Sequence, residues 1–121
     1  MEVTFKLDQW DIQSELVFVV DETVFTEERA QVVNEFWCDS DGRFEDAGSH
    51  VMAALTLYAV ECFRQVAFNN FKTAAWVMAK FDWSKEGQGV EGFFSFEEAG
   101  LKLKEIEPWH IEFEHVERVE P

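Results

Sequence analysis

Basic residues are scarce in this chain of 121 residues, in which ten lysines and arginines stand against 25 aspartates and glutamates. The formal net charge is −15 and the isoelectric point is near 4.4. A protein of this sign repels phosphate backbones and anionic lipids, so direct binding to nucleic acid or to an anionic membrane is not expected. A basic protein partner is favoured instead, although the same charge also serves to keep an aromatic-rich domain soluble.

Cysteine is nearly absent, and the two that occur, Cys38 and Cys62, lie outside any C-x-x-C or C-x-x-H spacing. This usage predicts a reduced intracellular protein with two incidental thiols, and a disulfide is the less favoured alternative. The first residues include acids rather than a basic segment followed by an apolar run, and no stretch of about 18 residues is free of charge. We therefore expect no secretory signal and no membrane span, which predicts a cytoplasmic protein.

Proline is rare too, and no repeat, low-complexity tract or linker interrupts the chain. Hydrophobic residues make up 47% of it, with 13 Phe and 5 Trp, which excludes a disordered acidic tail and predicts one folded domain over residues 1–121. The charge is uneven. Residues 1–46 hold thirteen acids and three bases, residues 47–85 hold two acids and four bases, and residues 86–121 hold ten acids and three bases.

The first third of the chain reads as a β-hairpin followed by a helix. Apolar residues alternate with polar ones over residues 3–8, and β-branched and aromatic residues fill residues 16–20, so two antiparallel strands are expected. Thr26 suits a helix N-cap, with acids in the first turn, and this helix is expected to end near Asp39. A second helix begins at Asp46 or Ser49 and runs to about residue 69, apolar over most of its circumference, which predicts a central buried helix.

The last third shows alternation again. Residues 74–83 read as a third strand, and residues 101–106 and 109–116 read as a final hairpin. Lys102 and Lys104 would then face Glu112 and Glu114 as cross-strand ion pairs. The predicted fold is α+β, an antiparallel sheet of four to five strands in the order strand-strand-helix-helix-strand-strand-strand, with two helices packed on one face.

The stretch "WCDSDGRFED", residues 37–46, resembles part of a calcium-binding loop. If Asp39 and Asp41 take positions 3 and 5 of an EF-hand, Gly42 falls correctly at position 6. Position 1 is then Trp37 and position 12 is Gly48, so the first and last ligands are missing. A helix-ending turn, in which Asp and Gly supply local hydrogen bonds and positive φ, is the favoured interpretation.

Other chemical motifs are equally incomplete. His110 and His115 would lie on opposite faces of a strand, and His50 stands at a helix end. The G-x-G-x-x-G string over Gly87–Gly92 follows a predicted strand and leads into "FFSF" rather than into a helix, so it lacks the phosphate-binding context. The sequence therefore assigns no catalytic residue, no metal ligand and no cofactor.

Several strings of the chain are distinctive: "TEE" opening a helix, "NEFW" at Asn34–Trp37, "GS" at Gly48–Ser49 and "KFDW" at Lys80–Trp83. In these features the chain resembles a small domain-of-unknown-function family carried on proteobacterial plasmids, integrative elements and prophages. The similarity runs from about Val3 to Ile106. The resemblance implies residence on a mobile element and supplies no catalytic residues.

This sequence departs from that family at Gly92–Phe94, where the family is more proline-rich, and the stretch Trp109–Val119 is not clearly covered.

Charge and context together favour a non-enzymatic acidic interaction protein. Its carboxylates would stand in for phosphates and inhibit a host nuclease, a CRISPR–Cas component or another defence protein, as anti-CRISPR or anti-restriction proteins do. The alternatives are a small metal-dependent or small-molecule enzyme that uses the acids of Asp39–Asp46 or the Gly87–Gly92 loop, and a dimeric accessory protein with exposed Trp and Phe as its interface. The protein is expected to be a monomer or a homodimer. The predicted partner-binding residues are Asp21, Glu22, Glu27, Glu28, Glu35, Asp39, Asp41 and Glu45.

Overall fold

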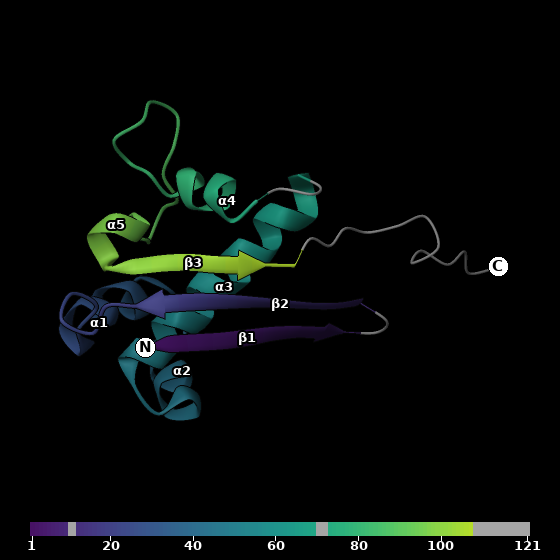
Figure 1. The fold of residues 1–121 in the computed structure, drawn as a ribbon. Coiled ribbons are helices and arrows are strands. Elements are labelled where there is room, and N and C mark those ends of the chain that lie inside the picture. The colour runs from purple at the N-terminus through teal and green to yellow at the C-terminus, as the bar shows by residue number, and fades with distance from the viewer. Residues whose placement is uncertain (10–11, 70–72, 108–121) are drawn as a thin grey trace, which may run out of the picture.

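A three-stranded antiparallel sheet forms one layer of the computed structural model, which describes residues 1–9, 12–69 and 73–107. The strands are β1 (Glu2–Gln9), β2 (Ile12–Val20) and β3 (Leu101–Ile106), in the spatial order β1-β2-β3. The helices lie on one side of the sheet, and α3 crosses behind it (Figure 1). The α+β class is thereby confirmed.

The strand pairing follows from the alternation of side chains. In β1 and β2, Phe5 lies opposite Leu16, and this register places the apolar residues of both strands on the face that meets the helices. On the other edge of β2, Phe18 pairs with Leu103 and Val17 pairs with Glu105, so Lys104 is the extra residue of a β-bulge.

Five helices connect β2 to β3 within the described residues: α1 (Glu27–Phe36), α2 (Ser40–Ala47), α3 (His50–Asn69), α4 (Ala74–Lys80) and α5 (Phe96–Ala99). Thr26 caps α1, as expected, because its hydroxyl accepts a hydrogen bond from the Arg29 amide. Ser49 does the same for α3, where its hydroxyl accepts from the Met52 amide. None of the described helices is long and apolar enough to cross a bilayer.

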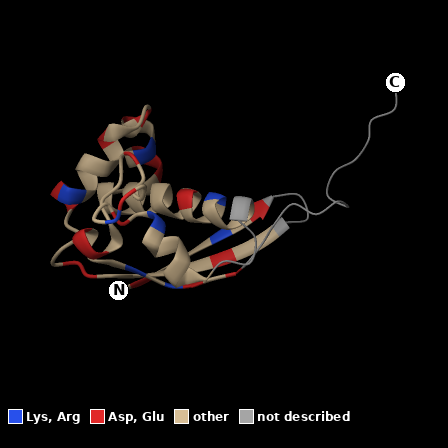
Figure 2. Cartoon of the chain, turned by 90° about the horizontal axis from the view of Figure 1, so that it is seen from above, with Lys and Arg blue, Asp and Glu red and all other residues tan. Residues whose placement is uncertain are grey.

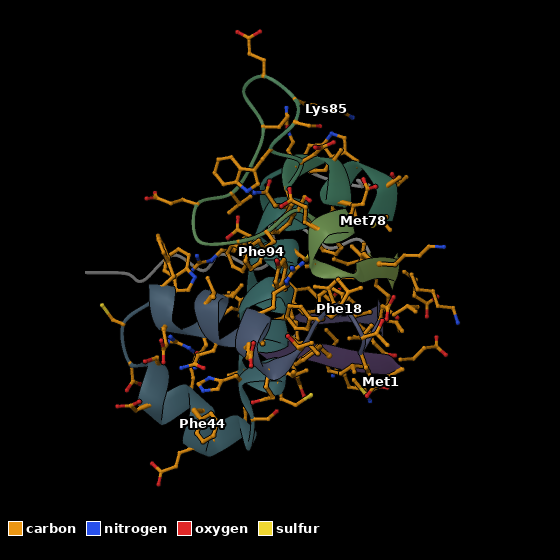
Figure 3. All side chains as sticks on the ribbon, turned by 90° about the vertical axis from the view of Figure 1, so that its left-hand side faces the viewer. Met1, Phe18, Phe44, Met78, Lys85 and Phe94 are labelled. Atoms are coloured by element: carbon orange, nitrogen blue, oxygen red, sulfur yellow. The ribbon has the colours of Figure 1, made fainter. Side chains whose placement is uncertain are left out.

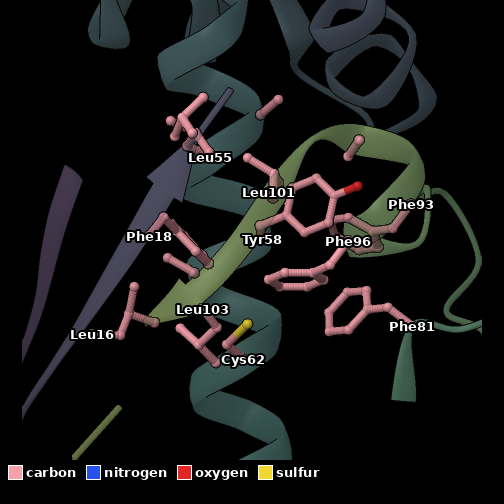
Figure 4. Packing of buried hydrophobic residues seen from close by; sticks show 14 of the residues in the cluster. Leu16, Phe18, Leu55, Tyr58, Cys62, Phe81, Phe93, Phe96, Leu101 and Leu103 are labelled. Carbon is pink, nitrogen blue, oxygen red and sulfur yellow. The ribbon is translucent and has the colours of Figure 1, made fainter. Parts of the chain in front are cut away.

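The core lies between the sheet and α3 and contains a group of aromatic rings packed among aliphatic side chains (Figure 4). Tyr58 of α3 is fully buried at its centre, with the rings of Phe81, Phe93 and Phe96 at centroid distances of 4.7 to 5.6 Å. Its hydroxyl donates a hydrogen bond to the Phe94 carbonyl over 2.9 Å. Burial raises the pKa of Tyr58, so the hydroxyl stays neutral and can remain a donor.

The predicted third strand is wrong, because Ala74–Lys80 forms α4. The Thr73 hydroxyl accepts a hydrogen bond from the Trp76 amide and caps the helix, and Val77 and Phe81 are buried at the four-residue spacing of a helical face. Residues four positions apart share a face in a strand and also in a helix, so alternation over so short a stretch does not distinguish the two. The alanines, methionine and lysine of this stretch are good helix formers.

The predicted turn after α1 is shorter than expected, because it is limited to Cys38 and Asp39, and Asp41 and Gly42 lie instead in α2. Asp39, just before it, has a left-handed backbone with φ of 64°, and this residue makes the sharp change of direction between the two helices. The expected order of elements and the sheet of four to five strands are not confirmed, because the described sheet has three. The predicted strand at 109–116, with its pairing of Glu112 and Glu114 to lysines, lies outside the described residues.

Candidate functional site

Residues 21–46, named here the acidic segment, include the turn after β2 and the helices α1 and α2. They hold nine acids and two bases, an excess of seven negative charges. All eight predicted partner-binding residues lie in this segment and all are exposed. Figure 2 shows residues of both signs on the helical layer and on the sheet. The eight predicted residues are thus exposed side chains of one sequence segment, between which Phe25, Ala30, Val33 and Asn34 are buried.

Neither arginine of the acidic segment neutralises a carboxylate there. The Arg29 guanidinium donates to the Glu98 carbonyl and lies 5.4 Å from the centre of the Phe94 ring. The ion pairs found among the described residues, Glu61–Arg64 and Glu2–Lys104, both lie outside the segment. The excess negative charge of α1 and α2 is therefore not cancelled locally.

Arg43 fastens the two helices of the segment together. Its Nε donates to the Asn34 side-chain oxygen over 2.8 Å, and its terminal nitrogens donate to the backbone carbonyls of Asn34, Trp37 and Cys38 over 2.6 to 3.1 Å. The last carbonyls of a helix have no intrahelical partner, so the guanidinium supplies the missing donors at the end of α1. The arginine is thus committed to backbone atoms.

Asn34 completes this junction and was missed by sequence reasoning as a structural residue. Its side chain is fully buried and its amide nitrogen donates to the Ser40 carbonyl over 3.1 Å, with the His50 Nδ1 at 3.3 Å. A buried amide needs partners on both its oxygen and its nitrogen. An asparagine in the last turn of an otherwise amphipathic helix, nine residues before an arginine, was the available signal.

Three of the predicted binding residues also serve the fold. The Glu27 carboxylate accepts from the His50 and Val51 amides over 3.0 and 2.8 Å, which caps the start of α3. The Asp21 carboxylate accepts from the amide and hydroxyl of Thr23, and these bonds lower the pKa of Asp21. Asp39 makes the corner before α2. Glu22, Glu28, Glu35, Asp41 and Glu45 extend from the helices or the turn without such a backbone-capping role.

Several large apolar side chains are exposed on α1 and in the loop after α4, and the sequence suggested exposed Trp and Phe as a dimer interface without identifying which ones. Phe36 and Trp83 are each 51% exposed, and Val32 is 61% exposed. Trp37 lies at the end of α1 with its ring 5.0 Å from that of Phe36. We name Phe36, Trp37 and Trp83, together with the neighbouring aliphatic Val32, the aromatic patch.

The family comparison gives the chain a place among known proteins. A family model described as protein of unknown function DUF2528 matches residues 16–118. The chain belongs to this family. The match confirms the resemblance to a domain of unknown function carried by prophages, and it starts later and extends further than the expected span of Val3 to Ile106.

Two relatives of the DUF2528 chain come from a phage and a prophage. One is protein ea10 of Escherichia phage lambda, and the other is the lambda prophage-derived protein ea10 of Escherichia coli O6:H1 strain CFT073. Each is 29% identical to this chain over 99 residues, which is 81% of this chain and 80% of the relative. No solved structure matches. The family match over residues 16–118 includes the whole acidic segment, which is therefore part of the family domain.

The alternative sites lack the arrangement their chemistry needs. Asp41 and Gly42 lie within the helix α2, so they do not form a calcium-binding loop. His50, at the start of α3, packs its ring 4.5 Å from that of Phe44. No group of three or more His, Cys, Asp or Glu residues is placed to hold a metal ion within the described parts of this DUF2528 chain. The predicted placement of His110 and His115 on opposite faces of a strand concerns residues outside those parts.

The two cysteines and the glycine-rich loop also differ from what a reactive or phosphate-binding site requires. Burial raises the pKa of the Cys62 thiol, which is therefore unreactive, and Cys38 is exposed and free. Gly87–Gly92 lies in the loop between α4 and the four-residue helix α5, not after a strand as predicted.

An open hollow of about 390 Å³ lies between α4, α5 and β3. Two of its polar groups are used locally, because Asp82 accepts from Ser84 and the Ser95 hydroxyl accepts from the Glu98 amide at the start of α5.

Proposed function

We propose that this protein is a non-enzymatic interaction protein of a mobile element, which binds a basic host protein through its acidic segment. The partner would be a nucleic-acid-binding or defence protein, such as a nuclease of a CRISPR or restriction system, whose DNA-binding surface the acidic segment occupies. The observation that carries the proposal is the excess of seven negative charges on residues 21–46, whose two arginines are held by backbone carbonyls.

A phosphate-like surface must be rigid as well as negative. If the carboxylates moved freely, the ordering cost on binding would offset much of the attraction to lysines and arginines. Here α1 and α2 are joined by Arg43, and Glu27 ties α1 to the start of α3. These contacts support a preorganised array of carboxylates, and the prophage origin of a relative supports the mobile-element context.

The proposal is tested by removing charge at two places in equal amount. One variant carries Glu22→Gln, Glu28→Gln, Asp41→Asn and Glu45→Gln in the acidic segment. Its matched control carries Asp8→Asn, Glu86→Gln, Glu97→Gln and Glu105→Gln, four exposed acids elsewhere. Binding to purified CRISPR and restriction nucleases is measured in each case, with duplex DNA as competitor.

We expect the first variant to bind a target nuclease about tenfold more weakly, and the control to bind nearly as well as the parent protein. Salt of about 0.5 M should weaken the parent complex strongly, because it screens exposed charges. Equal losses in both variants would mean that only overall charge matters. Binding that is unchanged at high salt, or no binding to any basic nuclease, contradicts the proposal.

A second candidate function is favoured by the aromatic patch, since exposed Phe36 and Trp83 could form the interface of a dimeric accessory protein. Sedimentation at rising protein concentration separates the two. A concentration-dependent dimer that Phe36→Ala dissociates would favour this second reading, while a stable monomer supports the first.

A further inference from the structure

We infer that the aromatic patch, together with the carboxylates beside it, is a receptor for arginine side chains of the protein partner. This inference rests on the proposed function and deepens it, because it names where the partner is anchored and by which chemistry. Charge alone attracts any cation. Exposed rings next to carboxylates select a planar one, because guanidinium groups stack on aromatic faces and pair with carboxylates through two hydrogen bonds.

The rings of the patch are held in place by the loop that follows α4. The Trp83 Nε1 donates to the Phe93 carbonyl over 2.8 Å, and the Trp37 ring lies 5.9 Å from the Phe93 ring. Both tryptophans therefore contact the same short stretch of loop. The indole and phenyl rings are fixed on one side by the protein while substantial area stays exposed.

Two glycines permit this close approach. A Cβ atom at Gly92 would come within 2.5 Å of the Phe36 ring and 2.9 Å of the Trp37 ring, and one at Gly89 would come within 2.4 Å of the Trp83 ring. Both glycines also have positive φ, at 89° and 107°. The loop backbone thus lies directly against the rings, an arrangement that fixes exposed aromatic side chains before any partner arrives.

Carboxylates flank the patch from two elements. On α1, Glu28 and Glu35 are four residues before and three residues after Val32, so they project from the same side of the helix. Glu91 is exposed in the loop, next to Gly92. The cation of α1, Arg29, is bonded to the Glu98 carbonyl instead. An arginine that stacked on the rings would therefore find acids within reach.

Charge decides between the possible occupants. A second copy of this chain carries a net charge of −15, so repulsion opposes self-association through a face flanked by acids. Single-stranded nucleic acid also stacks on exposed aromatic rings, but its phosphates are repelled for the same reason. A cationic protein segment satisfies both the rings and the acids. The protein itself holds one such contact, between Arg29 and the Phe94 ring.

Short oligoarginine and oligolysine peptides of equal length and charge test the inference on the full chain. Affinity is measured by calorimetry and by tryptophan fluorescence. We expect oligoarginine to bind about fivefold more tightly than oligolysine, with a change in tryptophan emission, because lysine is a point charge with no planar face. Phe36→Ala and Trp83→Ala should reduce oligoarginine binding to the level of oligolysine.

Phe44→Ala is the matched control, since Phe44 is 40% exposed on α2 and lies at the opposite end of the molecule from the loop that carries Lys85 (Figure 3). It should leave the preference for arginine unchanged. Trp83→Phe keeps a ring without its N–H donor and should retain most of the preference, and circular dichroism checks that each variant is folded.

The outcomes separate this inference from the proposed function. If both peptides bind equally and the ring variants change nothing, the inference is wrong, while salt-sensitive binding to a nuclease can still stand. If the ring variants reduce nuclease binding but the four-charge variant does not, the proposed function fails and an apolar contact remains. Tighter binding of an oligonucleotide than of oligoarginine, or dissociation of a dimer by Phe36→Ala, overturns the arginine receptor.

Discussion

The acidic segment and the open face of the sheet differ in their balance of acidic and basic residues. On the sheet face that no described helix covers, the acids Glu2, Asp8, Glu15 and Glu105 share the surface with Lys6, Lys102 and Lys104. Glu2 and Lys104 form an ion pair of 2.7 Å there. The acidic segment has nine acids, and its two arginines are bonded to backbone carbonyls.

The two regions therefore differ in their balance of charge. The acids and bases of the sheet face nearly cancel, whereas residues 21–46 carry seven excess negative charges. Substitutions in the two regions test whether their charged residues have different roles.

The largest effect is expected from Arg43→Ala. It leaves the buried Asn34 oxygen and the carbonyls at the end of α1 without their donor, so we expect a loss of about 3 kcal/mol in the free energy of unfolding. Urea denaturation measures the loss. On the sheet face, Lys104→Ala removes only an exposed ion-pair partner and should change stability immeasurably. Similar losses in the two variants would show that Arg43 does not join α1 to α2.

Tyr58 provides a reference, because it lies in the core beneath both regions. Tyr58→Phe leaves the Phe94 carbonyl without its donor and should cost about 1 to 2 kcal/mol of stability in urea denaturation. Its pKa is raised in the folded protein, so this contribution is complete below the unfolded value of about 10 and is lost as pH rises above it.

The chain contains one tyrosine, so ultraviolet absorbance of tyrosinate during an alkaline titration reports on Tyr58 alone. We expect ionisation to coincide with unfolding, as followed by circular dichroism. Ionisation in a still-folded protein near the ordinary pKa contradicts the burial of this side chain.

A smaller effect is expected from Glu27→Gln, which weakens the cap on α3. A neutral amide oxygen accepts the His50 and Val51 amide hydrogens less strongly than a carboxylate, so the expected loss is about 1 kcal/mol. Glu28→Gln, one residue away, is the control and should have no such effect. If both variants lose the same stability, then the negative charge at the start of α1 matters and the cap does not.

The smallest effect separates two lowered carboxyl pKa values, one in each region. The pKa of Glu2 is lowered by its hydrogen bond and charge contact with Lys104, and that of Asp21 by hydrogen bonds from Thr23. In both cases the stabilisation is present above the unfolded pKa of about 4 and is lost as pH falls through the lower folded value.

Salt should distinguish these two carboxyl groups. At about 1 M salt we expect the pKa of Glu2 to move back toward its ordinary value, because the charge contact is exposed, and that of Asp21 to stay low. Carboxyl chemical shifts followed by NMR over an acid titration measure both. Equal salt responses would mean that charge also dominates at Asp21.

The alternation of residues 3–8 and 16–20 was enough to predict the hairpin, and Thr26 was enough to place the start of α1. These features are local, since a strand face and an N-cap are set by residues within a few positions of one another. The stretch 74–83 was misread as a strand because Val77 and Phe81 fit either period over so short a distance.

The candidate site divides in the same way. The acids of residues 21–46 could be located from the sequence, and they are exposed as predicted. The aromatic patch could not be found, because Phe36 and Trp83 are separated by 47 positions and meet only through the folded loop near Phe93. Nor could α2, whose helix is held by the contacts of Arg43 with the end of α1.

By itself, then, the sequence determined the net charge, its uneven distribution along the chain, the first hairpin and the central helix, because composition and local periodicity need no distant partner. Only the tertiary structure decided which carboxylates lack a cation. Ion pairing depends on which side chains the fold brings within a few ångströms of one another. In this fold Lys104 lies beside Glu2 across the sheet, whereas Arg29 and Arg43 donate to backbone carbonyls.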